Sequence, residues 1–361
     1  MKKKYFLLST FFYAIVIFYL AATTPISPHE AKILYTSHDI VASLMKLGES
    51  FIPGVIGLRI FFIFFGFLSI LFFYEFSRRY FSRREDAYLS TFIFMLLPGI
   101  VTGSTLVNVA IIVLPLVLLF VLLYEKDHFA LLPIIMLALF FIHEASILFF
   151  IAVLIYGILH KDKRLSILSG TFLVAFVYLA KGIEIGGRPS GHFAEIFGLY
   201  AALFSPFVFF YFFYTMYRIL LREKKTLLWY ISFIALAFSL IFSIRQRISI
   251  TDFAPYVMIS VPLMLDLYNR SLRVRLPEFQ KHYRLGFNML VVSLFLSVFS
   301  IFLYQMIFTV SKDHKKYFSN SVYKPYFLAK ELKEKGIHCK NTSNRRERYQ
   351  LQYYNIFPCT K

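Results

Sequence analysis

Charge is scarce in this sequence. Only 16% of its 361 residues are charged, 58% are hydrophobic, and the mean hydropathy is +0.66. A soluble domain has about a quarter charged residues and about half apolar ones. Apolar runs close to the ~20 residues that cross a bilayer recur along the chain. This composition excludes a water-soluble globular protein and predicts a polytopic helical membrane protein.

Several motifs of soluble enzymes are also missing. The sequence has no phosphate-binding loop, no glycine fingerprint for dinucleotides and no HExxH zinc helix. No sustained internal repeat is visible, which counts against a transporter built from inverted repeats.

Cysteine is nearly absent. Cys339 and Cys359 are the only two, and both lie in the polar tail after residue 310. A pair confined to one small polar segment predicts a disulfide in an oxidising compartment. Two free thiols, or a metal site, are the alternatives.

Windows between charged breaks define the candidate membrane spans. There are eleven of them: residues 5–22, 54–76, 87–101, 106–124, 129–142, 145–160, 165–181, 198–218, 226–244, 254–268 and 287–309. The apolar stretch 129–160 is broken only at His143–Glu144. One helix of that length would measure roughly 48 Å, too long for the hydrocarbon core, so we expect two short helices.

The span pattern predicts an all-α polytopic membrane domain, residues 1–310, and a small C-terminal domain, residues 311–361. Within that tail we expect a helix over 324–335 and a strand over 349–356. The amino-terminal MKKK and apolar run resemble a signal peptide, but the run is longer than a signal core. We therefore expect an uncleaved first span.

Lysine and arginine are unevenly distributed over the connections. One alternating set holds 20 of them, whereas the other set holds 6; the basic set comprises residues 2–4, 77–86, 124–128, 160–165, 218–225 and 267–286. This bias predicts a cytoplasmic amino terminus and, with an odd number of spans, an extracytoplasmic tail. The basic connections would face anionic lipid headgroups. No soluble basic domain is present, so we expect no nucleic-acid partner.

A titratable cluster follows the first span. The stretch TTPISPHEAKILYTSHD, residues 23–39, contains His29, Glu30 and Asp39 and would lie on the outer face. We expect an amphipathic helix over 30–47 in the membrane interface. Taken alone, this cluster is better explained by an interfacial helix whose charges face water.

Three other outer connections contain candidate residues. His143 and Glu144 interrupt an apolar run, where polar groups are costly and usually functional; a cavity wall, a metal-assisting role and a plain interfacial turn are all open. Arg245 and Arg247 lie in SIRQRISITDFAPY. Because a guanidinium group matches the geometry of a phosphate, they are candidates for a phosphate clamp; anchoring to lipid headgroups is the alternative. The glycine-rich stretch 181–195 predicts a mobile loop that closes over an acceptor, or mobility without chemistry.

The order of these segments is similar to that of a known family. SPHEAKI follows the first span, and the second span opens on an arginine and ends in a basic loop, in IGLRIFFIFFGFLSILFFYEFSRRYFSRRE. This order resembles the GT-C membrane glycosyltransferases, in the branch of protein O-mannosyltransferases and aminoarabinose transferases. There a D-E-A-type motif follows the first span and an R-L-P-S-type segment opens the next. The tail, with LAKELKEKGI and LQYYNI, also resembles the terminal domain of that branch.

The resemblance implies transfer of a sugar from a polyprenyl-phosphate donor to a glycan, lipid or protein acceptor. Such transfer needs a base for the acceptor hydroxyl, and cations or a divalent metal for the leaving phosphate. In this sequence His29 stands where the family has its leading acid. Glu30 is therefore the expected base, with Asp39 as a substitute and loss of activity as the alternative.

The resemblance also implies residues that bind substrate, in an integral protein of the bacterial inner membrane. The candidates are Arg59, His143, Glu144, Arg245 and Arg247; no metal ligands are assigned. A transporter or flippase of lipid-linked glycans or polar solutes, and a non-catalytic membrane scaffold, are the alternative functions.

Overall fold

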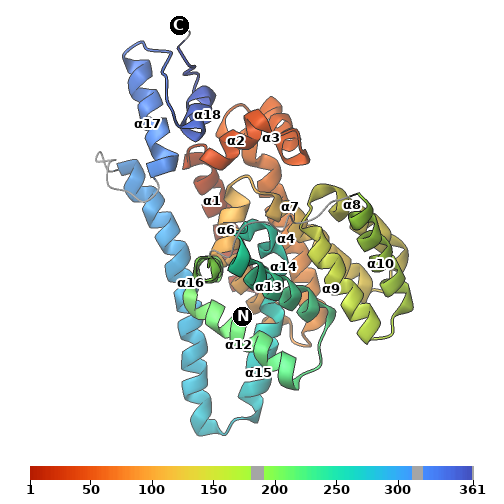
Figure 1. The fold of residues 1–361 in the computed structure, drawn as a ribbon. Helices are drawn as coiled ribbons and strands as arrows, with labels where there is room; N and C mark the ends of the chain where they lie inside the picture. The colour runs from red at the N-terminus through yellow and green to blue at the C-terminus, as the bar shows by residue number, and fades with distance from the viewer. Residues whose placement is uncertain (180–190, 311–319, 360–361) are drawn as a thin grey trace. The chain divides into compact units, whose positions relative to one another are not determined.

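In a computed structural model, the protein is helical throughout the residues that the structure describes, 1–179, 191–310 and 320–359 (Figure 1). The α-helices are α1 (Lys3–Thr23), α2 (Pro28–Thr36), α3 (Ile40–Phe51), α4 (Val55–Tyr80), α5 (Arg84–Met95), α6 (Pro98–Thr105), α7 (Val109–Glu125), α8 (Leu132–Ile142), α9 (Ser146–Leu159), α10 (Lys163–Tyr178), α11 (Phe193–Phe204), α12 (Pro206–Arg222), α13 (Leu227–Arg245), α14 (Ala254–Met258), α15 (Val261–Val274), α16 (Pro277–Val310), α17 (Asn320–Glu334) and α18 (Arg345–Tyr353). Within these ranges no β-strand occurs, so the predicted all-α class is confirmed.

Several helices suit a bilayer. Over the described ranges, α1, α4, α13 and residues Pro277–Met306 of α16 are long and apolar enough to cross one. The pairs α5–α6 and α11–α12 are bent by 60° and 106°, and each adds a span if the pair counts as one. Shorter apolar helices include α7 and α9. The chain is thus an integral membrane protein, with four to six candidate spans; the count of eleven stays a prediction.

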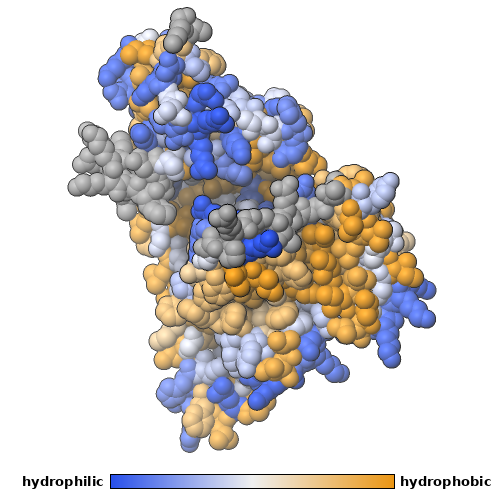
Figure 2. Space-filling view, in the orientation of Figure 1, coloured by the Kyte–Doolittle hydropathy of each residue, from blue (hydrophilic) through white to orange (hydrophobic). Residues whose placement is uncertain are grey.

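Apolar side chains cover the outer faces of α8, α9 and α10 (Figure 2). Phe141, Ile158, Ile167 and Val177 are all more than half exposed. In water such a continuous apolar surface would promote association. In lipid it is the expected surface of a membrane helix.

The break predicted at His143–Glu144 is confirmed. Helix α8 ends at Ile142 and α9 begins at Ser146. The His143 backbone is extended, with φ −153° and ψ 130°, which stops the helix.

The chain divides into two compact units, and α1, α4, α6 and α16 contribute residues to both. Unit 1 consists of Met1–Tyr13, Phe65–Gly103 and Val109–Val298, and unit 2 of Ala14–Phe64, Ser104–Asn108 and Phe299–Lys361. The predicted tail therefore groups with the first loop, which is the connection between α1 and α4 (residues 24–54) that contains α2 and α3. The predicted boundary at residue 310 stays a prediction.

The expected helix over 30–47 is interrupted, in unit 2. Helix α2 begins in a capping box, in which Ser27 Oγ accepts from Glu30 N and the Glu30 carboxylate accepts from Ser27 N. Ser37 is extended, and the Asp39 carboxylate then caps α3 by accepting from Ala42 N at 2.9 Å. The prediction of one continuous helix is wrong because residues 37–39 stop α2 and start α3.

Helices α17 and α18 form the end of unit 2 and pack against each other (Figure 1). The expected helix over 324–335 is confirmed as α17, but the expected strand over 349–356 is wrong. Asn344 caps α18 by accepting from Arg346 N, and Leu351 packs with Ala329 and Ile356. The predicted disulfide Cys339–Cys359 is present, with Cα atoms 4.9 Å apart.

Candidate active site

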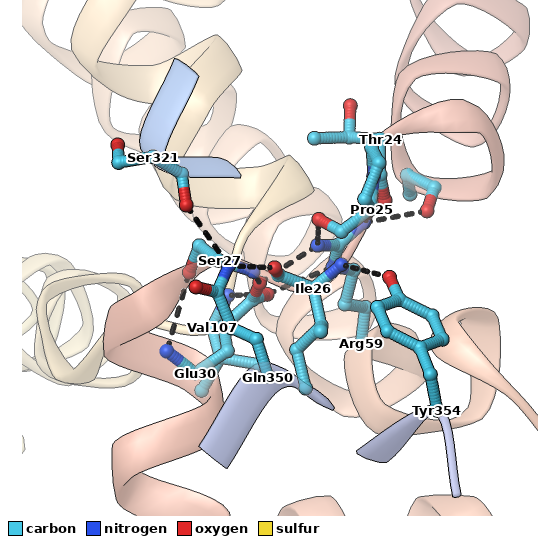
Figure 3. Close-up of polar contacts among 11 residues, drawn as sticks. Thr24, Pro25, Ile26, Ser27, Glu30, Arg59, Val107, Ser321, Gln350 and Tyr354 are labelled. Atoms are coloured by element: carbon cyan, nitrogen blue, oxygen red, sulfur yellow. Dashed lines mark hydrogen bonds and ion pairs between the residues drawn. The ribbon is translucent and has the colours of Figure 1, made fainter. Parts of the chain in front are cut away.

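Arg59 and Glu30 form a buried ion pair beneath the first loop of unit 2 (Figure 3). Arg59 lies near the start of α4 and is 0% exposed, and Glu30 lies in the first turn of α2 and is 1% exposed. Arg59 Nε donates to Glu30 Oε1 at 2.8 Å, and Nη2 donates to Oε2 at 2.7 Å. This two-point geometry is the strong, directional form of an arginine–carboxylate contact.

The remaining Arg59 donors go to backbone carbonyls. Nη1 donates to Ala21 O at 2.8 Å and to Thr24 O at 2.7 Å, and Nη2 donates to Pro25 O at 3.1 Å. A guanidinium has five N–H donors, so all of them are used. These bonds satisfy carbonyls that the end of α1 leaves without helical partners. They leave Arg59 no donor for a substrate, which weighs against the substrate-binding role predicted for it.

Glu30 is equally well satisfied. Its carboxylate also accepts from Ser27 N at 2.8 Å and from Val107 N at 3.0 Å, so four N–H groups surround it. Burial raises the pKa of Glu30, but the charge and hydrogen bonds of Arg59 and the backbone N–H groups lower it, and the net shift is downward. An ionised carboxylate that is fully hydrogen-bonded and closed to solvent is a poor proton acceptor. The assignment of Glu30 as the base stays a prediction.

His29 and Asp39 lie on the solvent side of the same loop. Both are exposed. His29 precedes Glu30 in the first turn of α2, and Asp39 uses Oδ1 to cap α3. Of the three predicted catalytic residues, only these two have exposed side chains.

Residues of the C-terminal tail hydrogen-bond to the backbone of the first loop. Gln350 Nε2 donates to Ile26 O at 2.9 Å and to Ser321 O at 3.1 Å, while Tyr354 Oη accepts from Ile26 N at 3.2 Å (Figure 3). The sequence offered no signal for Gln350 or Tyr354 beyond their place in LQYYNI. Helix α18 and its C-cap residue thus hold both backbone polar groups of one loop residue, Ile26.

A second cluster surrounds the His143 turn in unit 1. His143 Nε2 lies 3.3 Å from Asp252 Oδ1, and both side chains are partly buried. Asp252 comes from the 3₁₀ turn Ile250–Asp252, and sequence reasoning had not selected it. Tyr256 Oη donates to Ser146 Oγ at 3.3 Å beside the same turn. Glu144 is exposed.

The predicted arginine clamp also lies in unit 1. Arg247 Nη2 donates to Glu195 Oε1 at 2.6 Å, and Glu195 Oε2 lies 3.1 Å from His192 Nδ1. The hydrogen bond from Arg247 lowers the pKa of Glu195. Arg245 is exposed at the end of α13.

The structure pairs only some of the predicted site residues. It joins Glu30 with Arg59, and places Arg245 and Arg247 two residues apart at the end of α13. Glu30 lies in unit 2, whereas the arginines and His143 lie in unit 1, so their convergence stays a prediction. Residues 180–190 of the predicted mobile loop lie outside the described residues. In the described part of the chain, no group of three His, Cys, Asp or Glu side chains could hold a metal ion.

Comparisons with known proteins identify the fold. No protein-family model matches the sequence, and no curated protein matches it. Two crystal structures of ArnT from Cupriavidus metallidurans are similar. The apo structure is 14% identical with a TM-score of 0.57, over 97% of this chain and 74% of ArnT. The structure bound to undecaprenyl phosphate is 12% identical with a TM-score of 0.55, over 98% of this chain and 75% of that one. The predicted resemblance to the aminoarabinose transferases thus holds for the fold, which is similar to that of ArnT over nearly the whole chain.

Proposed function

We propose that this chain is a membrane glycosyltransferase that moves a sugar from a polyprenyl-phosphate donor to an acceptor at the extracytoplasmic face. The observation that carries the proposal is the fold shared with ArnT over 97% of the chain, because one ArnT structure binds undecaprenyl phosphate. No observation favours a transporter or a scaffold over this function.

The proposed topology has eleven spans, a cytoplasmic amino terminus and an extracytoplasmic tail in the bacterial inner membrane. The disulfide Cys339–Cys359 supports the placement of the tail, since disulfides persist in oxidising compartments. The hydrogen bonds between Ile26 and the side chains of Gln350 and Tyr354 support placing the first loop on the same side.

Glu30 and Arg59 are positioning residues in this proposal. Their ion pair ties the end of α1, the start of α4 and the segment 104–108 to α2. A reacting group on that loop is then held in one geometry, which is how proteins reduce the entropic cost of a reaction.

His29 is the proposed proton acceptor. Its neutral imidazole takes the proton of the acceptor hydroxyl while that oxygen bonds to the anomeric carbon. The bond from the anomeric carbon to the donor's phosphate oxygen breaks, and the polyprenyl phosphate leaves with the electron pair. In unit 1, Arg245 has no carboxylate within ion-pair distance among the described residues and stays a proposed substrate-binding residue, whereas Arg247 pairs with Glu195.

A transfer assay with a polyprenyl-phosphate sugar in membranes tests the proposal. If His29 is the base, His29→Ala should lower transfer by about 10²–10⁴-fold at equal expression, whereas Asp39→Asn should have a small effect. Although part of its side chain is exposed, neighbouring protein atoms partly desolvate His29 and lower its pKa, and the adjacent Glu30 opposes this, so the pKa of His29 should lie below the usual 6.5. Wild-type transfer should therefore rise with pH through the pKa of His29 and level off above it.

Two outcomes would count against these assignments. Full activity in His29→Ala, with a strong loss in Asp39→Asn, would move the base to Asp39. Absence of transfer from every polyprenyl-phosphate sugar tested, by protein that is folded and inserted, would remove the enzymatic proposal itself.

A further inference from the structure

An open polar cavity of about 470 Å³ lies in unit 1, between the α4–α5 turn and the carboxyl-terminal half of α15. None of the candidate active-site residues lines it. Its charged and amide side chains are Arg83, Asp86, Asp266, Asn269, Arg270 and Arg273. The volume is in the range of small-molecule sites, which hold roughly 300–1,000 Å³.

Packed side chains hold the two walls of this cavity together. Ala87 from α5 and Leu265 and Tyr268 from α15 form one buried cluster with Phe81 from the turn. Close-packed interiors of this kind resist displacement. The distance between the two walls is therefore set by the fold.

The cavity carries positive charge that the protein itself does not neutralise. Arg270 is balanced, since Nη1 contacts Glu223 Oε2 at 2.6 Å and Nη2 contacts Asp266 Oδ2 at 2.8 Å. Across the described ranges, no carboxylate lies within ion-pair distance of Arg83 or Arg273. Two guanidinium groups, one on each wall, are thus available, and a guanidinium matches a phosphate at two points.

The amino-terminal end of the chain adds positive charge near the cavity. Met1 N donates to Glu85 O at 3.0 Å, in the first turn of α5. The contact brings Lys2–Lys4 to the same end of unit 1 as Arg83. Both segments belong to the set of connections that the charge bias places in the cytoplasm.

The other lining groups restrict the form of the anion. Asp86 would repel a bare phosphate, but its carboxylate, the Asn269 amide and the Ser82 hydroxyl can all accept hydrogen bonds from hydroxyl groups. A phosphate ester that also carries hydroxyls satisfies both kinds of side chain.

Exposed apolar residues adjoin the cavity lining in the chain. Val274, Leu276 and Phe279 follow Arg273 and are 88%, 66% and 58% exposed. Such side chains suit the surface of a bilayer, and basic pockets between membrane helices on the cytoplasmic side bind lipid headgroups.

We propose that this cavity binds a phosphate ester bearing free hydroxyls, supplied as the headgroup of an anionic phospholipid or as a soluble polyol phosphate. Arg83 and Arg273 bind the phosphate, and Asp86 and Asn269 accept from the hydroxyls. The site goes beyond the proposed sugar transfer and does not depend on it.

Lipid binding by the full chain in detergent tests the site. Native mass spectrometry would compare phosphatidylglycerol with phosphatidylcholine, which has a phosphate but no headgroup hydroxyl. The wild type should prefer phosphatidylglycerol by about tenfold or more, since charge-assisted contacts to phosphate are strong. Arg83→Gln with Arg273→Gln should abolish the preference. Arg84→Gln with Arg275→Gln, which removes equal charge from neighbours outside the cavity lining, should retain it.

Two further measurements sharpen the result. Asp86→Ala combined with Asn269→Ala, which removes both acceptors, should keep binding of phosphatidic acid and lose the preference for phosphatidylglycerol over it. Displacement of the lipid by glycerol 3-phosphate would assign a soluble source, and retention of the lipid would assign the membrane source. No preference in the wild type, or equal loss in both double variants, would overturn the proposal.

Discussion

Arg59 brings its five donors into a region that is closed to solvent, and each donor meets an oxygen of the protein. Burying a charge is costly unless it is paired and hydrogen-bonded, and here both conditions are met. The pair therefore contributes less by its net energy than by allowing one arrangement of the loop. Removing either partner leaves the other charge buried without compensation.

Glu30→Gln should lower the free energy of unfolding by about 3–5 kcal/mol, because it leaves the buried Arg59 without its counter-charge. The measurement is thermal unfolding in detergent, with Glu75→Gln as the matched control. Glu75 pairs with Arg79 on an exposed surface, where the loss should be within ~1 kcal/mol. Equal losses of stability in the two variants would contradict the role given to the buried Glu30–Arg59 pair.

The Glu30–Arg59 pair also predicts how the stability of the protein changes with pH. The pKa of Glu30 is lower in the folded protein than its ordinary value of 4.5, so its stabilisation is complete above that value. It is lost as the pH falls from 4.5 through the folded pKa. Loss of transfer in Glu30→Gln must therefore be compared at equal folded protein.

The sequence predicted which residues gather at this loop better than it predicted their roles. Glu30 and Arg59 were both selected, one as a base and one as a substrate ligand. Their pairing depends on how α2 packs against α4. The hydrogen bonds that Arg59 donates to backbone carbonyls depend on where α1 ends. Neither contact leaves a pattern in the sequence.

Among the helices, the first loop depends on a close approach between α3 and α4. Gly48 and Gly57 face each other with no side chains between them. A Cβ at Gly57 would lie 1.7 Å from Ile52 O, and one at Gly48 would lie 2.2 Å from Gly57 O. Since the obstructing atoms are backbone, α3 would have to move, and Arg59 follows Gly57 by two residues.

Gly57→Ala should therefore destabilise the protein and reduce transfer, although alanine favours a helix by up to about 1 kcal/mol over glycine. Gly198→Ala is the matched control, because Gly198 lies in α11 with nothing within 4 Å of its added Cβ. Thermal unfolding of both variants separates the clash from helix propensity. A Gly57→Ala protein as stable as the control would show that α3 adapts freely.

Helix boundaries were predictable where one signal dominated. The polar pair His143–Glu144 inside an apolar run located the α8–α9 break. Asp39 did not reveal the α2–α3 break, because an acid in an amphipathic stretch fits a helix face as well as an N-cap. The tyrosines and Ile356 favoured a strand, but Asn344 and the packing of Leu351 make residues 345–353 helical; tertiary packing commonly overrides strand propensity.

At the scale of the whole molecule, the uneven distribution of lysine and arginine predicts a membrane topology that can be tested. A reporter fused after Arg275 should be cytoplasmic, and one fused after Lys361 should be extracytoplasmic, because the basic connections remain inside. Alkaline phosphatase and green fluorescent protein fusions report the two sides. A cytoplasmic reporter at Lys361 would remove the support that the disulfide gives to the proposed topology.

The hydrogen bonds that Ile26 makes with Gln350 and Tyr354 join residues 324 and 328 positions apart. During synthesis at about 5–20 residues per second, the loop therefore waits roughly 16–65 s for its partners. Through that interval Ile26 has neither bond, and the ribosome has still to deliver α17, α18 and the second cysteine. A nascent chain interrupted before residue 350 would insert its helices and yet lack a finished first loop. Completion of the first loop therefore marks the synthesis and folding of α18.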